Sequence, residues 1–185
     1  KGIPPVITTD GPSGIRLRAT CSLLPSGTAL ACSWNLPLVQ DLYATMGREM
    51  VDKGTDVLLA PGMNIHRNPL CGRNFEYFSE DPLVTGKLAA AVVQGLQSAP
   101  VSACPKHFAC NNQEYNRNHN NSVVSARAHC YCAAHALYHL GGSRCRLFNV
   151  CRRLVCRDAL QLGTCCCLRS SLSADVAGEP EIVCA

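Results

Sequence analysis

The amino-acid sequence predicts an α/β protein built from parallel βαβ units. Strand-like and helix-like segments alternate from the N-terminus to about Ser125, which is the pattern of a parallel sheet with helical crossovers. The strand-like segments are apolar throughout rather than alternating, as expected of strands that are buried on both faces. Polar residues follow where each strand is predicted to end. Since parallel α/β folds bind ligands at the carboxyl ends of their strands, a functional site is expected there.

The first βαβ unit is predicted over residues 5–62. A short β-branched run closed by Asp-Gly, "PVITTDG", indicates the first strand and its turn. The segment "LPLVQDLYATMGREMVDKG", directly after Asn35, indicates a helix, because proline lies in its first turn, glycine ends it and apolar residues recur at helical spacing. Those apolar residues are Leu38, Leu42, Met46 and Met50. The apolar run "TDVLLAPG" then indicates the second strand.

The second βαβ unit begins with a long polar loop, "MNIHRNPLCGRNFEYFSED". Asp81 and Pro82 then begin a helix over "PLVTGKLAAAVVQGLQSA", with Asp81 as its cap. The run "VSACPKHFA" indicates the third strand. Beyond Ser125 neither the strand period nor the helix period is sustained, and the pattern admits one further helix, over Ala133–Leu140. The fold of the C-terminal third is therefore left open.

Length and charge argue against several classes of protein. A chain of 185 residues with a net charge of +4 forms one domain or part of a larger one. It lacks the dense basic stripe of a nucleic-acid-binding protein. No apolar run reaches the roughly 18 residues of a membrane-spanning helix, so no membrane partner is expected. No signal-peptide pattern is visible and no compartment is indicated. The sequence begins abruptly within a strand approach, so we expect earlier sequence to precede it.

The first candidate site residues are Asp10 and Arg16, in the motif "DGPSGIR". Asp10 ends a strand, and the Gly-Pro-Ser-Gly turn fixes the backbone before Arg16. A carboxylate holds vicinal sugar hydroxyls by accepting paired hydrogen bonds, while a nearby guanidinium donates to the same ring and keeps the acid ionised. The same spacing also fits a surface turn with a local ion pair, and spacing alone does not decide between them.

Further candidates follow the second and third strands. Arg73 lies in the long loop, whose aromatic residues argue against disorder and whose length favours a function. A purely structural pairing of Arg73 with Glu76 or Glu80 fits equally well. Lys106 and His107 follow the third strand, where the regular alternation of side chains relaxes, so both can reach one site. A lone histidine there would usually be structural, but the polar stretch "NNQEYNRNHNN" favours a polyhydroxyl ligand.

Cysteines divide the chain into two kinds of sequence. Nine of the fourteen cysteines lie after residue 125, together with seven arginines and no lysine. Cys130 and Cys132, and the triplet 165–167, lack the pair spacing of zinc sites, so no metal site is predicted. A cysteine-rich metal-binding protein is the least favoured alternative.

Three segments, "DGPSGIR", "PGMNIHRNPLCGRNFEYFSEDP" and "KHFACNNQEYNRNHNNSVVS", resemble glycoside hydrolase family 3, specifically its bacterial β-glucosidase branch. The resemblance covers residues 3–125 nearly without gaps. It implies that residues 1–128 are part of a (β/α)8 TIM-like barrel, so the expected fold is a partial barrel. It also implies a retaining enzyme that hydrolyses terminal non-reducing β-D-glucosyl residues of β-glucosides and cello-oligosaccharides without a cofactor.

The resemblance places five residues in the −1 subsite, which holds the glucosyl ring. They are Asp10, Arg16, Arg73, Lys106 and His107. A retaining glycosidase also needs a nucleophile and an acid/base. The family's nucleophile is an aspartate in a Ser/Thr-Asp-Trp context, whereas the only tryptophan here is Trp34, and the acid/base glutamate belongs to a second domain. No catalytic residue is therefore assigned. We expect the chain to be inactive as given, and a non-catalytic carbohydrate-binding fragment is the alternative.

The resemblance stops abruptly near residue 128. The family continues with a motif like Glu-Arg-Ala-Leu-Arg-Glu in an amphipathic helix. Here Arg127 and Ala128 still fit, and agreement ends at His129. We therefore interpret residues 129–185 as an unassigned Cys/Arg-rich tail, translated in the wrong reading frame after a single-base insertion or deletion near codons 126–129. A genuine alternative C-terminal extension is the competing interpretation.

Overall fold

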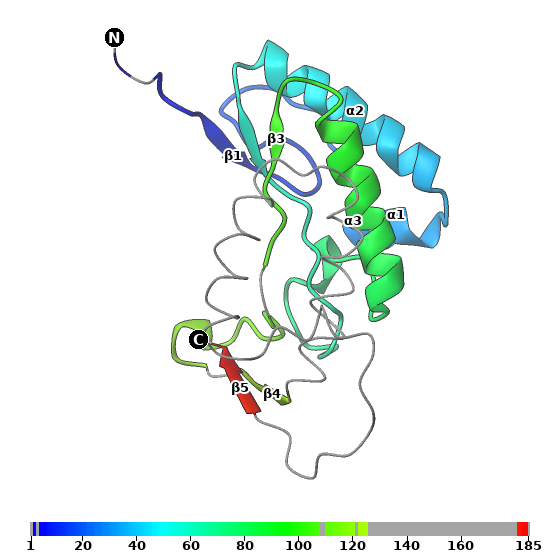
Figure 1. Ribbon diagram of the computed structural model, residues 1–185, viewed down its shortest axis with the longest axis vertical. Helices are drawn as coiled ribbons and strands as arrows, with labels where there is room; N and C mark the ends of the chain where they lie inside the picture. The colour runs from blue at the N-terminus through cyan, green and yellow to red at the C-terminus, as the bar shows by residue number, and fades with distance from the viewer. Residues whose placement is uncertain (1, 3, 108–109, 121, 126–180, 185) are drawn as a thin grey trace, which may run out of the picture.

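A three-stranded parallel sheet organises the molecule (Figure 1). The computed structural model describes residues 2, 4–107, 110–120, 122–125 and 181–184. The strands lie in the order β1 (Thr8–Asp10), β2 (Val57–Leu59) and β3 (Ser102–Ala103). All three fall inside the predicted segments, so the prediction of parallel βαβ units is confirmed. A complete eight-stranded barrel stays a prediction, because the described residues contain these three parallel strands.

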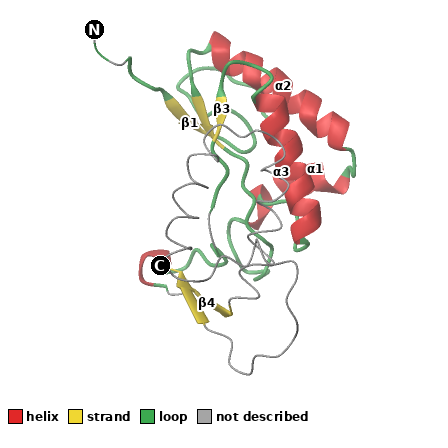
Figure 2. Cartoon of the chain, viewed as in Figure 1, coloured by secondary structure: helices red, strands yellow, loops and turns green. Residues whose placement is uncertain are grey.

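Three helices connect the strands along the chain and lie to one side of the sheet (Figure 2): α1 (Gly27–Cys32), α2 (Leu36–Asp52) and α3 (Pro82–Leu96). Asn35 caps α2, because its side chain accepts a hydrogen bond from the backbone N–H of the third helical residue at 3.1 Å. Asp81 caps α3 by accepting from two backbone N–H groups at 2.7 and 3.0 Å. Both predicted starts are confirmed. The sequence did not reveal α1, since six residues are too few to show a helical period.

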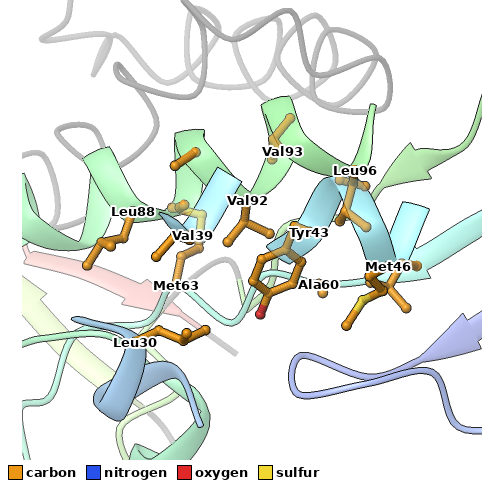
Figure 3. Close-up of a cluster of buried hydrophobic side chains, with 14 of the residues drawn as sticks. Leu30, Val39, Tyr43, Met46, Ala60, Met63, Leu88, Val92, Val93 and Leu96 are labelled. Atoms are coloured by element: carbon orange, nitrogen blue, oxygen red, sulfur yellow. The ribbon is translucent and has the colours of Figure 1, made fainter. Parts of the chain in front are cut away.

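Helices α2 and α3 pack against each other and supply much of the buried core (Figure 3). The predicted stripe of α2 is partly wrong: Met46 and Met50 are buried, but Leu38 is exposed, and Val39 and Tyr43 take its place in the core. Residues spaced strictly by four advance about 40° per step around a helix of 3.6 residues per turn. A stripe with this spacing therefore starts outside the interface at Leu38 and turns into it only by Met46, whereas one that starts at Val39 and alternates steps of four and three stays in it.

The close approach of the two helices requires glycine on both sides. A Cβ on Gly95 would lie 2.3 Å from the carbonyl oxygen of Gln40, and one on Gly47 would lie 2.7 Å from that of Leu96. Between these contacts the buried Tyr43 hydroxyl donates to the carbonyl oxygen of Pro12, in the loop after β1. Helix α2 therefore fixes the loop that carries the first candidate site residues.

Two 3-10 helices, η1 (Asn74–Glu76) and η2 (Arg117–His119), shape the loops that follow β2 and β3. Beyond η2, β4 (Ser122–Ser125) pairs antiparallel with β5 (Glu181–Cys184), and the sequence predicted neither strand. The helix expected over 133–140 lies outside the described residues. Within the described part of the chain, no helix is both long and apolar enough to span a membrane.

Candidate functional site

Asp10 stands at the carboxyl end of β1 between two cations. The Nζ atom of Lys106 lies 2.5 Å from its Oδ1 atom, and an NH1 donor of Arg16 lies 3.3 Å from its Oδ2 atom. Lys106 reaches this position because the backbone after β3 continues beside the backbone after β2, where Gly62 and Lys106 form an isolated parallel bridge. The carboxyl ends of the strands therefore lie at one edge of the sheet, as the sequence predicted.

The turn after Asp10 depends on its two glycines. Gly11 and Gly14 adopt φ angles of +146° and +138°, in a region that residues with a side chain rarely enter. A Cβ on Gly14 would also lie 2.4 Å from the carbonyl oxygen of Ser22. The turn brings the backbone N–H of Arg16 to 3.0 Å from the carbonyl oxygen of Asp10, which positions the guanidinium beside the carboxylate.

The cations keep Asp10 ionised. Partial burial of this carboxyl works against its charged form, but the hydrogen bond and charge of Lys106, together with the charge of Arg16, outweigh burial and lower the pKa of Asp10. Its side chain is 36% exposed, so its remaining lone pairs can accept hydrogen bonds from a ligand. The arrangement suits a ligand that offers hydroxyl groups to the carboxylate and hydroxyl oxygens to the flanking cations.

A chain of alternating charges extends away from Lys106. The Oε2 atom of the buried Glu76 lies 3.9 Å from Lys106 Nζ, and its Oε1 atom lies 2.5 Å from Arg73 Nε. Arg73 in turn lies 3.9 Å from Glu114, which accepts a hydrogen bond from Arg117 at 3.1 Å. We call this set the charge network; in order along it, its members are Asp10, Lys106, Glu76, Arg73, Glu114 and Arg117.

Arg73 therefore has a structural partner as well as a place near the candidate site. Of the two acids that the sequence offered, Glu76 is the one that pairs with it, at 2.5 Å. Partial burial disfavours the charged guanidinium, but the hydrogen bond and charge of Glu76 and the charge of Glu114 raise the pKa of Arg73 above its ordinary value. Arg73 is thus held as a permanent cation one carboxylate away from Lys106.

His107, which is joined to Lys106 by a cis peptide bond, belongs to a second polar cluster. Its Nδ1 atom lies 2.9 Å from the hydroxyl of the buried Tyr77, and the two rings meet edge to face. Burial, followed by the charges of Arg73 and Lys106, lowers the pKa of His107 to about 4. Burial also raises the pKa of Tyr77 to about 12. Both rings are therefore neutral near pH 7.

Asparagines hold this second cluster in place. Asn111 donates from Nδ2 to the Tyr77 hydroxyl at 2.9 Å and to Glu114 Oε1 at 3.1 Å. The buried Asn64, which follows β2, accepts from the backbone N–H of Asn111 at 2.9 Å and donates to its carbonyl oxygen at 3.0 Å. The loops after β2 and β3 are thereby joined through side-chain amides.

The structure brings four of the five predicted site residues into the charge network or directly against it. Asp10, Arg16 and Lys106 are in contact, and Arg73 reaches Lys106 through Glu76. His107 is next to Lys106 in sequence, but its ring bonds to Tyr77. Sequence reasoning missed the individual roles of Tyr77, Asn111, Glu114 and Arg117, although most of these lie in the polar stretch that it singled out.

No metal site emerges from the described residues, since they contain no group of three or more side chains suited to hold an ion. The cysteines between 129 and 180 lie outside the described part of the chain. The site is built from carboxylates, amides, an imidazole and cations.

Comparison with known proteins agrees with these motifs. The chain matches the Glycosyl hydrolase family 3 N terminal domain over residues 1–131. It is 52% identical over 129 residues to a beta-glucosidase of Ruminococcus albus, covering 69% of this chain and 14% of that protein. It is 46% identical over 140 residues to thermostable beta-glucosidase B of Acetivibrio thermocellus, covering 68% and 18%. The chain thus spans less than a fifth of these relatives.

Solved structures extend the comparison to three dimensions. Beta-glucosidase 3B of Thermotoga neapolitana, solved in complex with glucose, has a TM-score of 0.60 at 48% identity, over 61% of this chain and 17% of that one. The beta-glucosidase of Kluyveromyces marxianus, also solved with glucose, has a TM-score of 0.71 at 38% identity, over 75% and 18%. From the family match over most of its length, this chain belongs to glycosyl hydrolase family 3, as a fragment related to the family's β-glucosidases.

Proposed function

We propose that the chain supplies the glucose-binding part of a retaining β-glucosidase, which releases terminal non-reducing β-D-glucosyl residues from β-glucosides and cello-oligosaccharides. The observation that carries the proposal is the ionised Asp10 held between Lys106 and Arg16 at the carboxyl edge of the sheet. Membership of the family and relatives that are named β-glucosidases and solved with glucose support it.

In this proposal the five predicted residues form the −1 subsite. Asp10 accepts hydrogen bonds from two neighbouring hydroxyls, and Lys106 and Arg16 donate to the oxygens of the same groups. Arg73 and His107 line the far side of the ring. Because Lys106 already holds Asp10 at 2.5 Å, the carboxylate is charged and oriented before a sugar arrives. Such preorganisation reduces the cost of binding.

Hydrolysis needs groups that we assign outside this chain. A retaining glycosidase places two carboxyl groups about 5 Å apart, one as nucleophile and one as acid/base. The described carboxylates that meet the sugar-binding edge are engaged by cations, and Asp158 and Asp175 lie outside the described residues without the expected tryptophan neighbour. We therefore propose that the 185-residue chain binds its ligand without turning it over, and that its parallel sheet is part of a (β/α)8 barrel.

The experiment that tests the proposal measures binding and turnover on the same preparation. Isothermal titration with glucose should detect binding that Asp10→Asn weakens at least tenfold, since the asparagine keeps the shape but loses the charge that both cations recognise. Asp41→Asn is the matched control, because it removes the same charge from an exposed position on α2. Equal affinity in the two variants would contradict the binding role of Asp10. Turnover of an aryl β-glucoside by the purified chain would contradict its proposed inactivity.

We also propose that residues 129–185 are translated from a shifted reading frame. The abrupt gain of cysteine and loss of lysine after residue 125 supports it. Resequencing the DNA from about codon 110 past codon 185 tests it directly. A second frame that restores an amphipathic helix and a Ser/Thr-Asp-Trp motif would establish the shift. An unbroken frame would instead support a genuine extension, and measuring zinc bound per chain would then test the cysteine-rich metal-binding alternative.

A further inference from the structure

We propose that Tyr77 and Asn111 are positioning residues that hold His107 in a single tautomer, with its proton on Nε2, so that the imidazole acts as a hydrogen-bond donor beside Lys106. The use of this donor by a sugar rests on the proposed function. The tautomer itself does not, because it follows from hydrogen-bond directions within the chain.

The direction of the hydrogen bonds is set at Asn111. Its Nδ2 atom lies 3.1 Å from Glu114 Oε1 and 2.9 Å from the Tyr77 hydroxyl. An ionised carboxylate only accepts hydrogen bonds, so the atom that faces Glu114 must be the amide nitrogen. Its second N–H then donates to Tyr77. The Tyr77 oxygen is therefore an acceptor toward Asn111.

The Tyr77 hydroxyl proton has one destination among the described residues. Its oxygen accepts from Asn111, and the remaining partner at hydrogen-bond distance is His107 Nδ1, at 2.9 Å. If Nδ1 carried a proton, Tyr77 would accept twice and its own buried O–H would have no acceptor, which is unfavourable for a buried polar group. The hydroxyl therefore donates to a bare Nδ1. A neutral imidazole with a bare Nδ1 carries its proton on Nε2.

The protonation states and the scaffold agree with this direction. The pKa of His107 is lowered to about 4 and that of Tyr77 is raised to about 12, so neither ring is charged near neutral pH. Asn64 fixes the backbone of Asn111 from both sides, at 2.9 and 3.0 Å, and Thr28 Oγ1 donates to the carbonyl oxygen of Tyr77 at 3.0 Å. Asn111 and Tyr77 are thus each held by a different segment of the chain. We call the hydrogen-bonded series of Asn111, Tyr77 and His107 the relay.

The relay gives the site a defined polarity. Lys106 and the Nε2–H group of His107 are both donors, whereas Asp10 is an acceptor. A ligand must then offer lone pairs near His107 and protons near Asp10. A hydroxyl can meet either requirement, but a ligand group that is only a donor is rejected at His107, because two donors cannot pair.

The tautomer can be read directly from the two-bond ¹H–¹⁵N correlation spectrum of the uniformly ¹⁵N-labelled 185-residue chain at pH 7 without sugar. The His107 signals are assigned by their loss in His107→Gln. We expect a non-protonated shift at Nδ1 and a protonated shift at Nε2. A protonated Nδ1, or averaged shifts at both nitrogens, would overturn the proposal on the wild-type chain alone.

Two variants test the positioning residues. Tyr77→Phe should average the two nitrogen shifts of His107, whereas Tyr115→Phe, which removes the same hydroxyl from a side chain that is 85% exposed, should leave them unchanged. Asn111→Asp replaces the donor by an acceptor, so the Tyr77 hydroxyl should turn toward the new carboxylate and the His107 proton should move to Nδ1. A folded Tyr77→Phe or Asn111→Asp chain with an unchanged tautomer would exclude the relay.

Binding measurements separate this inference from the proposed function. Tyr77→Phe should weaken glucose binding about fivefold, the equivalent of one hydrogen bond. A chain that shows the Nε2–H tautomer but binds no glucose would contradict the proposed function and leave the relay intact. A chain that binds glucose with a protonated Nδ1 would contradict the relay alone.

Discussion

Where α2 meets α3, the contact is made by Val39, Tyr43, Val92 and their neighbours, with glycines where the backbones approach. At the carboxyl edge of the sheet, by contrast, side chains meet as charges of alternating sign. Apolar contacts are non-directional and tolerate small shifts, whereas an ion pair is favourable only if its partner is in place. The first region therefore contributes mainly to stability, and the second holds the charged side chains of the proposed sugar-binding site.

The largest change in the free energy of unfolding should come from a substitution where α2 and α3 pack together. Leu96→Ala, at a fully buried position of α3, should lower the free energy of unfolding by about 3 to 4 kcal/mol because it removes a buried side chain and leaves a cavity. Leu83→Ala on the same helix, at a position 40% exposed, is the matched control and should cost under about 1 kcal/mol. Urea unfolding measures both. Similar losses in the two variants would mean that α3 is not packed as described.

The next largest effect should come from the buried acid of the charge network. Glu76→Gln removes the nearer of the two carboxylate partners of Arg73 and should lower the free energy of unfolding by about 2 to 3 kcal/mol. Glu80→Gln, at an exposed position of the same loop, should change it by less than about 0.5 kcal/mol. Urea unfolding again compares them. Equal stabilities would show that the Glu76 pair is not maintained in solution.

Lowering the pH should reduce the free energy of unfolding through protonation of His107. The folded ring takes up its proton only near pH 4, whereas an unfolded histidine does so near 6.5. Between these values the unfolded state binds more protons, so the free energy of unfolding falls as the pH is lowered and levels off below about 4. We expect a fall of about 1 kcal/mol, because a half-exposed ring is partly screened by solvent.

The groups around His107 set the sign of this effect. Arg73 and Lys106 oppose its protonation, and Glu76 and Glu114 favour it more weakly than burial disfavours it. His107→Gln should flatten the pH dependence of unfolding between 6.5 and 4, and His66→Gln serves as the comparison because it removes a histidine from the preceding loop. A profile that keeps its slope in His107→Gln would place the responsible proton elsewhere.

The smallest effect on stability should come from Arg16, whose side chain is 66% exposed. Arg16→Gln should change the free energy of unfolding by less than about 0.5 kcal/mol, yet lower glucose affinity about threefold by removing a charged donor. Arg18→Gln, at an exposed position nearby, should change neither. Titration calorimetry measures the affinity and urea unfolding measures the stability. An Arg16→Gln variant that loses stability as well as affinity would contradict a separation of the two at the carboxyl edge.

Much of the fold could be predicted because its signals are local. Asn35 and Asp81 mark the starts of α2 and α3 through caps that act within three residues. Asp10 and Lys106 could be placed at the same edge of the sheet in advance, because the carboxyl ends of parallel strands share one edge. Leu38 was misplaced because a four-residue repeat drifts around the helix. The sequence of α2 alone does not show which side faces the core, because that side depends on how α3 packs against it.

The second polar cluster could not be predicted for a different reason. Tyr77 and Asn111 meet because two irregular loops follow particular paths, and no periodic signal in the sequence records such a path. The polar stretch after the third strand identified the region but not the partners, since several asparagines there offer the same chemistry. Asn64, in the loop after β2, places Asn111 in this position by hydrogen-bonding to its backbone N–H and carbonyl groups.

The contact between Asp10 and Lys106 joins residues 96 positions apart. At the roughly 5 to 20 residues that a ribosome adds each second, Asp10 is made about 5 to 20 s before its partner. During that interval β1 and the helices can begin to assemble, with the Arg16 partner of Asp10 already made and its Lys106 partner still to come. The carboxyl edge of the sheet is therefore completed late in a growing chain, and a polypeptide released before residue 106 would carry the three helices without the Lys106–Asp10 ion pair.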